Sequence, residues 1–234
     1  MSFWKKLFGG GSKEAAGEGN PLVRSPRIRL LLADGARFET ADGAFPLLNI
    51  SESGLGLLVE NSVAGRMSGT LFLGSESLPV ELEVVRQTGT FVGARFVSDA
   101  GPVRGVLKRL FLEEIRATEM SQVAGRELQV ESGTPRWYYA PGNYELFYVE
   151  KEGKPARLEM EWNGRVVAAS EGLRARVGHL QAEAREKPGH AKSSLVDWEG
   201  EIGDEDRTKA IRILENVPGL DPVVRGMLVG MLRR

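Results

Sequence analysis

Three arginines stand close together near the start of this sequence, in the stretch RSPRIR: Arg24, Arg27 and Arg29. A guanidinium binds planar partners through paired hydrogen bonds, and typical partners are phosphate oxygens and the O6/N7 edge of guanine. Residues 21–117 hold eleven Lys and Arg against eleven Asp and Glu, so the cluster is not part of a general basic face. We interpret it as a local candidate for binding phosphate or guanine.

A second polar stretch, NISESGLG, follows between two apolar runs and contains Asn49, Ser51 and Gly54. An Asn side chain can pair with a base edge, a Ser hydroxyl can bind a phosphate oxygen, and glycine lets backbone N–H groups approach a ligand. Together with the arginines, these residue types suit a guanine nucleotide that carries phosphates. The alternative is that the stretch is an ordinary turn between strands and that the arginines are solvated.

The composition narrows the protein class. Hydrophobic residues make up 41% of the 234 residues, which is enough for a buried core. The absence of cysteine excludes disulfides, thiolate zinc sites and cysteine nucleophiles, and it suits a reducing cytosol. A net charge of −1 argues against binding to a nucleic acid polymer, and no apolar run is long enough to span a membrane. We therefore expect a cytoplasmic protein.

Residues 1–20 are expected to be a flexible N-terminal segment, because GGGSKEAAGEGN has the composition of a linker. Residues 3–8 place Phe3, Trp4, Leu7 and Phe8 on one face of a short helix and two lysines on the other. This stretch has two interpretations. It is either an amphipathic contact with a membrane surface or partner groove, or a frayed terminus.

Residues 21–117 predict a small antiparallel β-barrel followed by a helix. The expected strands are residues 27–33, 36–40, 54–60, 69–74, 78–87 and 91–97. Asp34-Gly35 predicts a hairpin turn between the first two strands. The apolar period then becomes helical over residues 101–117, with Pro102 near the start and Val103, Val106, Leu107, Leu110 and Phe111 on one face.

The order of these features resembles the PilZ domain, a bacterial receptor module for cyclic di-GMP. NISESG resembles the family's [Asp/Asn]-x-Ser-x-x-Gly motif at Asn49, Ser51 and Gly54, and PRIRL resembles the end of its Arg-x-x-x-Arg motif, with Arg27 as the second arginine. VGARFV resembles the strand before the family's closing helix. The resemblance implies a mainly β fold and a cyclic di-GMP site at these residues, with Arg27 and Ser51 in loop or rim positions.

This sequence departs from the family pattern at the first arginine, where position 23 is Val. Arg24 is one place late, so Arg24 or Arg29 would have to reach the ligand from a shifted register. The alternative is a site that has lost its nucleotide. Some family members without intact arginines resemble this chain and act through protein partners instead.

Residues 118–234 resemble no family and predict a second α+β domain. Strands are expected at 127–132, 136–140, 144–151, 157–170 and 194–202, with turns at Pro141-Gly142-Asn143 and Asn163-Gly164. Two helices end the chain. Asp204 is expected to cap the first, with Ile211, Leu214 and Val217 facing inward. Asp221 is expected to cap the second, with Pro222 in its first turn and the apolar set Val223, Val224, Met227, Leu228, Met231 and Leu232.

The aromatic-rich stretch of residues 137–148 has two interpretations, a packed core or an exposed patch for a partner. His179 and His190 are too isolated to indicate a metal site, and no catalytic motif stands out. We therefore expect no enzyme, no cofactor and no metal. The leading hypothesis is a cyclic di-GMP-responsive regulator of an unidentified protein partner in motility, biofilm formation or secretion. The alternative is a PilZ-like adaptor that binds no nucleotide.

Overall fold

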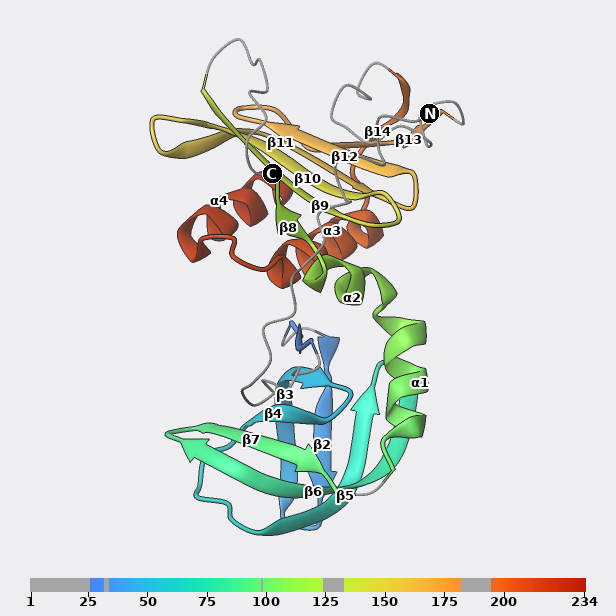
Figure 1. Ribbon diagram of the computed structural model, residues 1–234, viewed down its shortest axis with the longest axis vertical. Coiled ribbons are helices and arrows are strands. Elements are labelled where there is room, and N and C mark those ends of the chain that lie inside the picture. Colours follow the sequence, from blue (N-terminus) through green and yellow to red (C-terminus); the bar gives the residue numbers. More distant parts are fainter. Residues whose placement is uncertain (1–25, 32–33, 98, 124–132, 182–194) are drawn as a thin grey trace, which may run out of the picture.

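The computed structural model describes residues 26–31, 34–97, 99–123, 133–181 and 195–234. Figure 1 shows a β-barrel at one end of the molecule and a second sheet at the other. Helices α2 (Leu112–Thr118), α3 (Asp204–Asn216) and α4 (Pro222–Leu232) lie between them. The expected mainly β architecture, with an N-terminal barrel and a following α+β region, is confirmed.

Six antiparallel strands form the barrel and enclose its core. In chain order they are β2 (Arg37–Thr40), β3 (Gly43–Ser51), β4 (Gly54–Leu58), β5 (Arg66–Leu73), β6 (Glu76–Thr88) and β7 (Phe91–Phe96). The neighbours run β3-β2-β5-β6-β7-β4, and pairing of β3 with β4 closes the ring. Phe38, Leu55 and Leu82 are fully buried inside it. Closure leaves the barrel without free edges.

The expected hairpin at Asp34-Gly35 is wrong. The short strand β1 (Ile28–Arg29) pairs with β3 and not with β2, so it lies outside the closed ring. Strand β3 was not predicted, because Pro46 within a run weakens the case for a strand. It nevertheless pairs with three strands, β1, β2 and β4, and it carries Asn49 and Ser51.

The single helix predicted at 101–117 is also wrong, since it divides at Phe111. Helix α1 (Gly101–Leu110) contributes Val103, Val106 and Leu107 to the barrel core. Helix α2 (Leu112–Thr118) contributes Ala117 to the core of the second region. One straight helix could not present an apolar stripe to two separate cores, and after the break Ala117 of α2 joins the second core while Ile115 still packs against the barrel core.

The second sheet is a sequential antiparallel meander. Its strands are β8 (Ser121–Gln122), β9 (Thr134–Ala140), β10 (Tyr144–Lys151), β11 (Lys154–Trp162), β12 (Arg165–Ser170), β13 (Arg176–Leu180) and β14 (Val196–Glu201). Asn163 and Gly164 have φ values of 50° and 77°, as the predicted tight turn requires. Strand β13 was not predicted, and the strand expected at 127–132 lies outside the described residues.

The aromatic stretch is mostly core. Trp137, Tyr138, Tyr144, Phe147 and Tyr148 are all at most 6% exposed, and Tyr139 is half-buried. The packed-core interpretation of residues 137–148 is therefore confirmed, and an exposed aromatic patch there is wrong.

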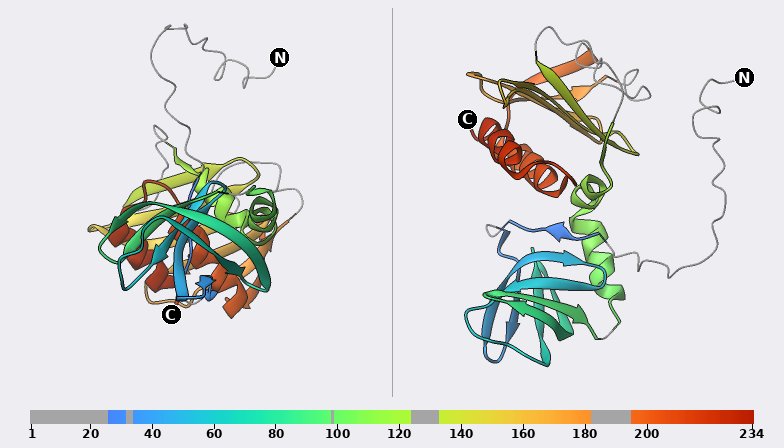
Figure 2. Two further views of the ribbon diagram at one scale, coloured as in Figure 1. Left: turned by 90° about the horizontal axis from the view of Figure 1, so that it is seen from below. Right: turned by 60° about the vertical axis from the view of Figure 1, so that its left-hand side comes forward.

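Helices α3 (Asp204–Asn216) and α4 (Pro222–Leu232) cover one face of this sheet, as Figure 2 shows. Ile211, Leu214 and Val217 are buried as expected. Asp221 caps α4 by accepting hydrogen bonds from the backbone N–H groups of residues 223 and 224 at 2.8 and 3.0 Å.

One expectation for these helices is wrong. Asp204 does not cap α3, because it is the first helical residue and Gly203 occupies the cap position without a side-chain bond. Of the apolar residues in α4, Val223 and Met227 are 66% and 36% exposed. The apolar face of α4 is consequently narrower than its sequence indicates, and these two side chains lie on its outer surface.

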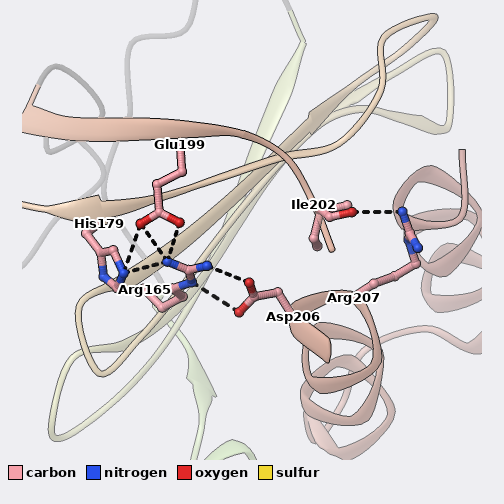
Figure 3. Close-up of polar contacts among 6 residues, drawn as sticks. All are labelled: Arg165, His179, Glu199, Ile202, Asp206 and Arg207. Carbon is pink, nitrogen blue, oxygen red and sulfur yellow. Dashed lines mark hydrogen bonds and ion pairs between the residues drawn. The ribbon is translucent and has the colours of Figure 1, made fainter. Parts of the chain in front are cut away.

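An arginine fastens α3 to the sheet. The Arg165 guanidinium donates to both carboxylate oxygens of Asp206 on α3, at 3.1 and 2.6 Å, and to Glu199 on β14 at 2.8 Å (Figure 3). His179 lies 3.0 Å from the same Glu199 carboxylate. Arg207, the next residue of α3, donates to the Ile202 carbonyl at 2.9 Å (Figure 3). These contacts fix the orientation of the helix pair on the sheet.

Candidate functional site

Strand β1 positions the predicted arginines by simple alternation. Ile28 and Leu30 point into the barrel core and are 2% and 8% exposed. Because successive side chains of a strand point to opposite faces, Arg27 and Arg29 lie on the outer face, and both are exposed. Arg29 sits opposite Asn49 in the β1–β3 register. The two predicted motif halves are therefore on neighbouring strands.

Arg27 and Asn49 contact each other directly. The Arg27 Nη1 donates to Asn49 Oδ1 at 2.8 Å. Space for the Asn49 side chain depends on Gly56 in β4, because a Cβ on Gly56 would lie 2.8 Å from Asn49 Nδ2. Gly56 was not singled out by the sequence, although it stands only two residues beyond the motif glycine.

Ser51 and Gly54 have structural roles in the turn between β3 and β4. The Ser51 hydroxyl donates to the Gly54 carbonyl at 3.1 Å and accepts from the Ser53 backbone N–H at 3.4 Å. A Cβ on Gly54 would lie 2.2 Å from the Ala94 carbonyl oxygen, where β4 meets β7. Ser51 is the last residue of β3, at the end of the strand, and its side chain is only 2% exposed. For these two residues the structure matches the ordinary-turn interpretation.

The C-terminal region touches β1 through Asn216. Its Oδ1 accepts from the Arg29 backbone N–H at 2.7 Å, and its Nδ2 donates to the Arg29 carbonyl at 3.2 Å and to the Arg212 carbonyl at 2.9 Å. Asn216 is 5% exposed at the end of α3. The Asn216 side chain therefore pairs with the main chain of β1 on the edge that does not face β3, as a neighbouring strand would. In this way it joins the barrel to the helices.

A cavity of about 370 Å³ lies between β1 and the α3–α4 turn. Its charged lining residues are Arg27, Arg29, Glu215 and Arg225. Arg225 is 8% exposed, and its Nη2 donates to the carbonyls of Val217 and Leu220 at 3.3 and 3.1 Å. Its Nε is buried without a hydrogen-bond partner. Burial, and next the nearby Arg29 charge, lower the pKa of Arg225.

Arg225 was not identified from the sequence as a site residue, because it belongs to no motif. It is the only charged residue of α4, PVVRGMLVGML, and that isolation within an apolar helix was the available signal.

The remaining predicted features lie elsewhere. Arg24, Val23, His190 and residues 3–8 are outside the described residues. A larger cavity of about 800 Å³ lies at the other end of β3, around residues 40–46 and 58–68, and contains none of the predicted site residues. Within the described ranges, no group of three His, Asp or Glu side chains could hold a metal, and no helix is long and apolar enough to span a bilayer.

Comparisons with known proteins add little to this geometry. No protein-family model matches the chain, and no curated protein does. Among solved structures, the crystal structure of the Legionella uncharacterized protein Lpg0364 is similar over 37% of this chain and 95% of that chain. The identity is 17% and the TM-score is 0.34, a level of similarity that carries no argument about function.

Proposed function

We propose that this protein is a cyclic di-GMP-responsive sensor of the PilZ type that regulates a protein partner in motility, biofilm formation or secretion. The observation that carries the proposal is the Arg27–Asn49 hydrogen bond of 2.8 Å. It brings the arginine stretch and the Asn-x-Ser-x-x-Gly stretch together on the outside of a closed barrel, beside a cavity.

The chemistry of this surface suits the ligand. Arg27 and Arg29 are exposed on one face of β1, where a guanidinium can grip a phosphodiester or the guanine O6/N7 edge through two hydrogen bonds. Asn49 can pair with a base edge after releasing Arg27. Binding would regulate a partner if the ligand made different contacts in two arrangements of the barrel and the C-terminal region.

The alternative is an adaptor that binds no nucleotide. Two observations favour it. The Ser51 hydroxyl is already bonded to the Gly54 carbonyl, and Val23 occupies the position of the family's first arginine. In this case the barrel is a scaffold, and contact with a partner takes place on another surface.

Calorimetric titration with cyclic di-GMP separates the two. We expect the wild type to bind and Arg27→Ala to weaken binding about ten- to a hundred-fold, because a lost charge-assisted pair costs about 1.5–3 kcal/mol. Arg66→Ala is the matched control, since Arg66 is an exposed arginine of β5 that does not line this cavity. Arg24→Ala should approach the loss seen for Arg27→Ala if Arg24 takes the missing motif position, and it should be near neutral if it does not.

Val23→Arg decides between sensor and adaptor. This variant restores the family's Arg-x-x-x-Arg spacing with Arg27. Binding by Val23→Arg without binding by the wild type would replace the sensor with the adaptor. Absence of binding by both would overturn cyclic di-GMP as the ligand.

A further inference from the structure

The cavity between β1 and the α3–α4 turn collects positive charge from two distant parts of the chain. Arg27 and Arg29 come from the barrel, and Arg225 comes from the last helix. Among the described residues that line the cavity, Glu215 is the single carboxylate against these three guanidiniums. Arg29 and Arg225 carry like charges in a partly enclosed space and therefore repel, and Glu215 and Asp221 offset this repulsion at Arg225.

The hydrogen bonds of Arg225 are incomplete. Two are made by Nη2 to main-chain carbonyls, while the Nε–H is buried without an acceptor. A buried donor without a partner destabilises a folded protein, and a charged donor does so more strongly. Within the described part of the chain, Arg225 forms no ion pair at all. Arg225 is therefore a guanidinium without an ion-pair partner on the lining of a cavity, where a bound anion would supply the missing counter-charge.

Arg29 of β1 also lines the cavity. Its backbone is fixed by Asn216 at 2.7 and 3.2 Å, so the origin of its side chain is well defined. Its guanidinium makes neither a hydrogen bond nor an ion pair with the described residues, and it is close enough to Arg225 for the two charges to affect each other. An oxyanion between Arg29 and Arg225 would remove that repulsion.

We propose that this cavity binds a phosphate-type oxyanion, held between Arg29 of the barrel and Arg225 of the last helix. The volume of about 370 Å³ lies at the small end of ligand pockets, so it suits a phosphate group with part of an attached molecule. Free phosphate and the phosphodiester of a nucleotide share this chemistry. The anion site adds detail to the proposed function. It rests on that function only where cyclic di-GMP is taken as the source of the phosphodiester. Arg225 thereby makes the C-terminal region part of the site.

The test uses the full chain with two probes, inorganic pyrophosphate and cyclic di-GMP, at constant ionic strength. The readout is the arginine Nε–Hε region of nitrogen-proton NMR spectra. We expect the Arg225 Nε–Hε signal to shift and saturate with a bound probe, because an anion beside the guanidinium changes its electrostatic environment. Arg29→Gln should weaken probe binding at least tenfold, and Arg66→Gln should leave it unchanged.

Arg225→Gln gives a second measurement, with circular dichroism as its check on folding, because Arg225 also bonds two carbonyls. If this variant unfolds, Arg29→Gln and the Arg225 signal of the wild type still decide the matter, since the Arg29 side chain is exposed.

Pyrophosphate binding that depends on Arg29 and shifts the Arg225 Nε–Hε signal supports the site, even if cyclic di-GMP does not bind and the proposed function fails. Binding of cyclic di-GMP without a change at Arg225 overturns this inference and leaves the proposed function standing. If neither pyrophosphate nor cyclic di-GMP binds, this inference and the proposed function are both overturned.

Discussion

At the scale of single residues, Gly54 is required by packing whatever the barrel binds. A Cβ at this position would lie 2.2 Å from the Ala94 carbonyl oxygen, and the obstacle is main chain that cannot rotate away. The motif glycine therefore permits the close approach of β4 to β7 that closes the ring.

We expect Gly54→Ala to lower the free energy of unfolding by about 1–3 kcal/mol, because the added methyl group must force the strands apart. Urea denaturation measures this. Gly105→Ala is the matched control, since Gly105 is exposed in α1 and its Cβ would meet nothing within 4 Å. That substitution should stabilise the protein by about 0.5–1 kcal/mol. An equal, small effect of both substitutions would show that the β4–β7 seam tolerates a side chain.

At the scale of elements, β1 is a two-residue strand whose position depends on both of its neighbours. β3 pairs with one edge, and Asn216 binds the Arg29 backbone on the other. So short a strand has little stability of its own. The exposed arginines of the candidate site consequently depend on an asparagine that belongs to the C-terminal helices.

We expect Asn216→Ala to increase the exchange rate of the Arg29 amide about ten- to a hundred-fold, since a buried donor that loses its acceptor costs about 1–3 kcal/mol. Hydrogen exchange followed by NMR measures it. Asn216→Asp separates the two halves of the contact, because it keeps the oxygen that accepts from the Arg29 N–H and loses the donor to the Arg29 and Arg212 carbonyls. Unchanged protection of Arg29 in Asn216→Ala would mean that pairing with β3 alone holds β1.

At the scale of the whole molecule, charged side chains connect the barrel to the C-terminal helices. Arg212 of α3 pairs with Asp34 at 2.6 Å, and Lys209 pairs with Glu113 of α2 at 3.3 Å. Glu114 of α2 is 2% exposed beside them, with its Oε1 3.9 Å from Arg212 and its Oε2 without a partner. Burial raises the pKa of Glu114 from 4.5 to about 7, and Arg212 opposes that rise only partly.

This pKa makes the stability of the junction depend on pH. The folded state binds a proton on Glu114 that the unfolded chain releases near pH 4.5, so the contribution is complete below pH 4.5 and is lost as the pH rises to about 7. We expect the free energy of unfolding of the wild type to fall by about 3 kcal/mol across this window relative to Glu114→Gln. Denaturant titrations between pH 4 and about 8 measure the difference.

Glu113→Gln is the matched control, because it removes the neighbouring carboxylate, which pairs with Lys209, and leaves Glu114 in place. It should keep a fall in stability with rising pH, with the midpoint moved to lower pH, because the Glu113 charge contributes to the raised pKa of Glu114. Parallel curves for the wild type and Glu114→Gln would contradict a protonated Glu114 in the folded state.

The sequence by itself determined the features that depend on neighbouring residues. Alternating apolar positions define most strands of both sheets, and Asn163-Gly164 defines its turn because glycine and asparagine accept positive φ. The motif order also indicated that Arg27 and Asn49 belong together, and they lie 2.8 Å apart. Asp221 predicted the start of α4, because its side chain accepts a hydrogen bond from the Val223 backbone N–H.

The tertiary structure decided what depends on residues far apart in the chain. Asp34-Gly35 has the residues of a hairpin, yet pairing with β3 and Asn216 places β1 elsewhere. The helix at 101–117 breaks because two cores compete for its apolar face. Arg29 and Asn216 are 187 positions apart, and no local pattern encodes a contact of that range. The charged cavity beside Arg225 exists only because the last two helices pack against their sheet and carry an arginine to the barrel.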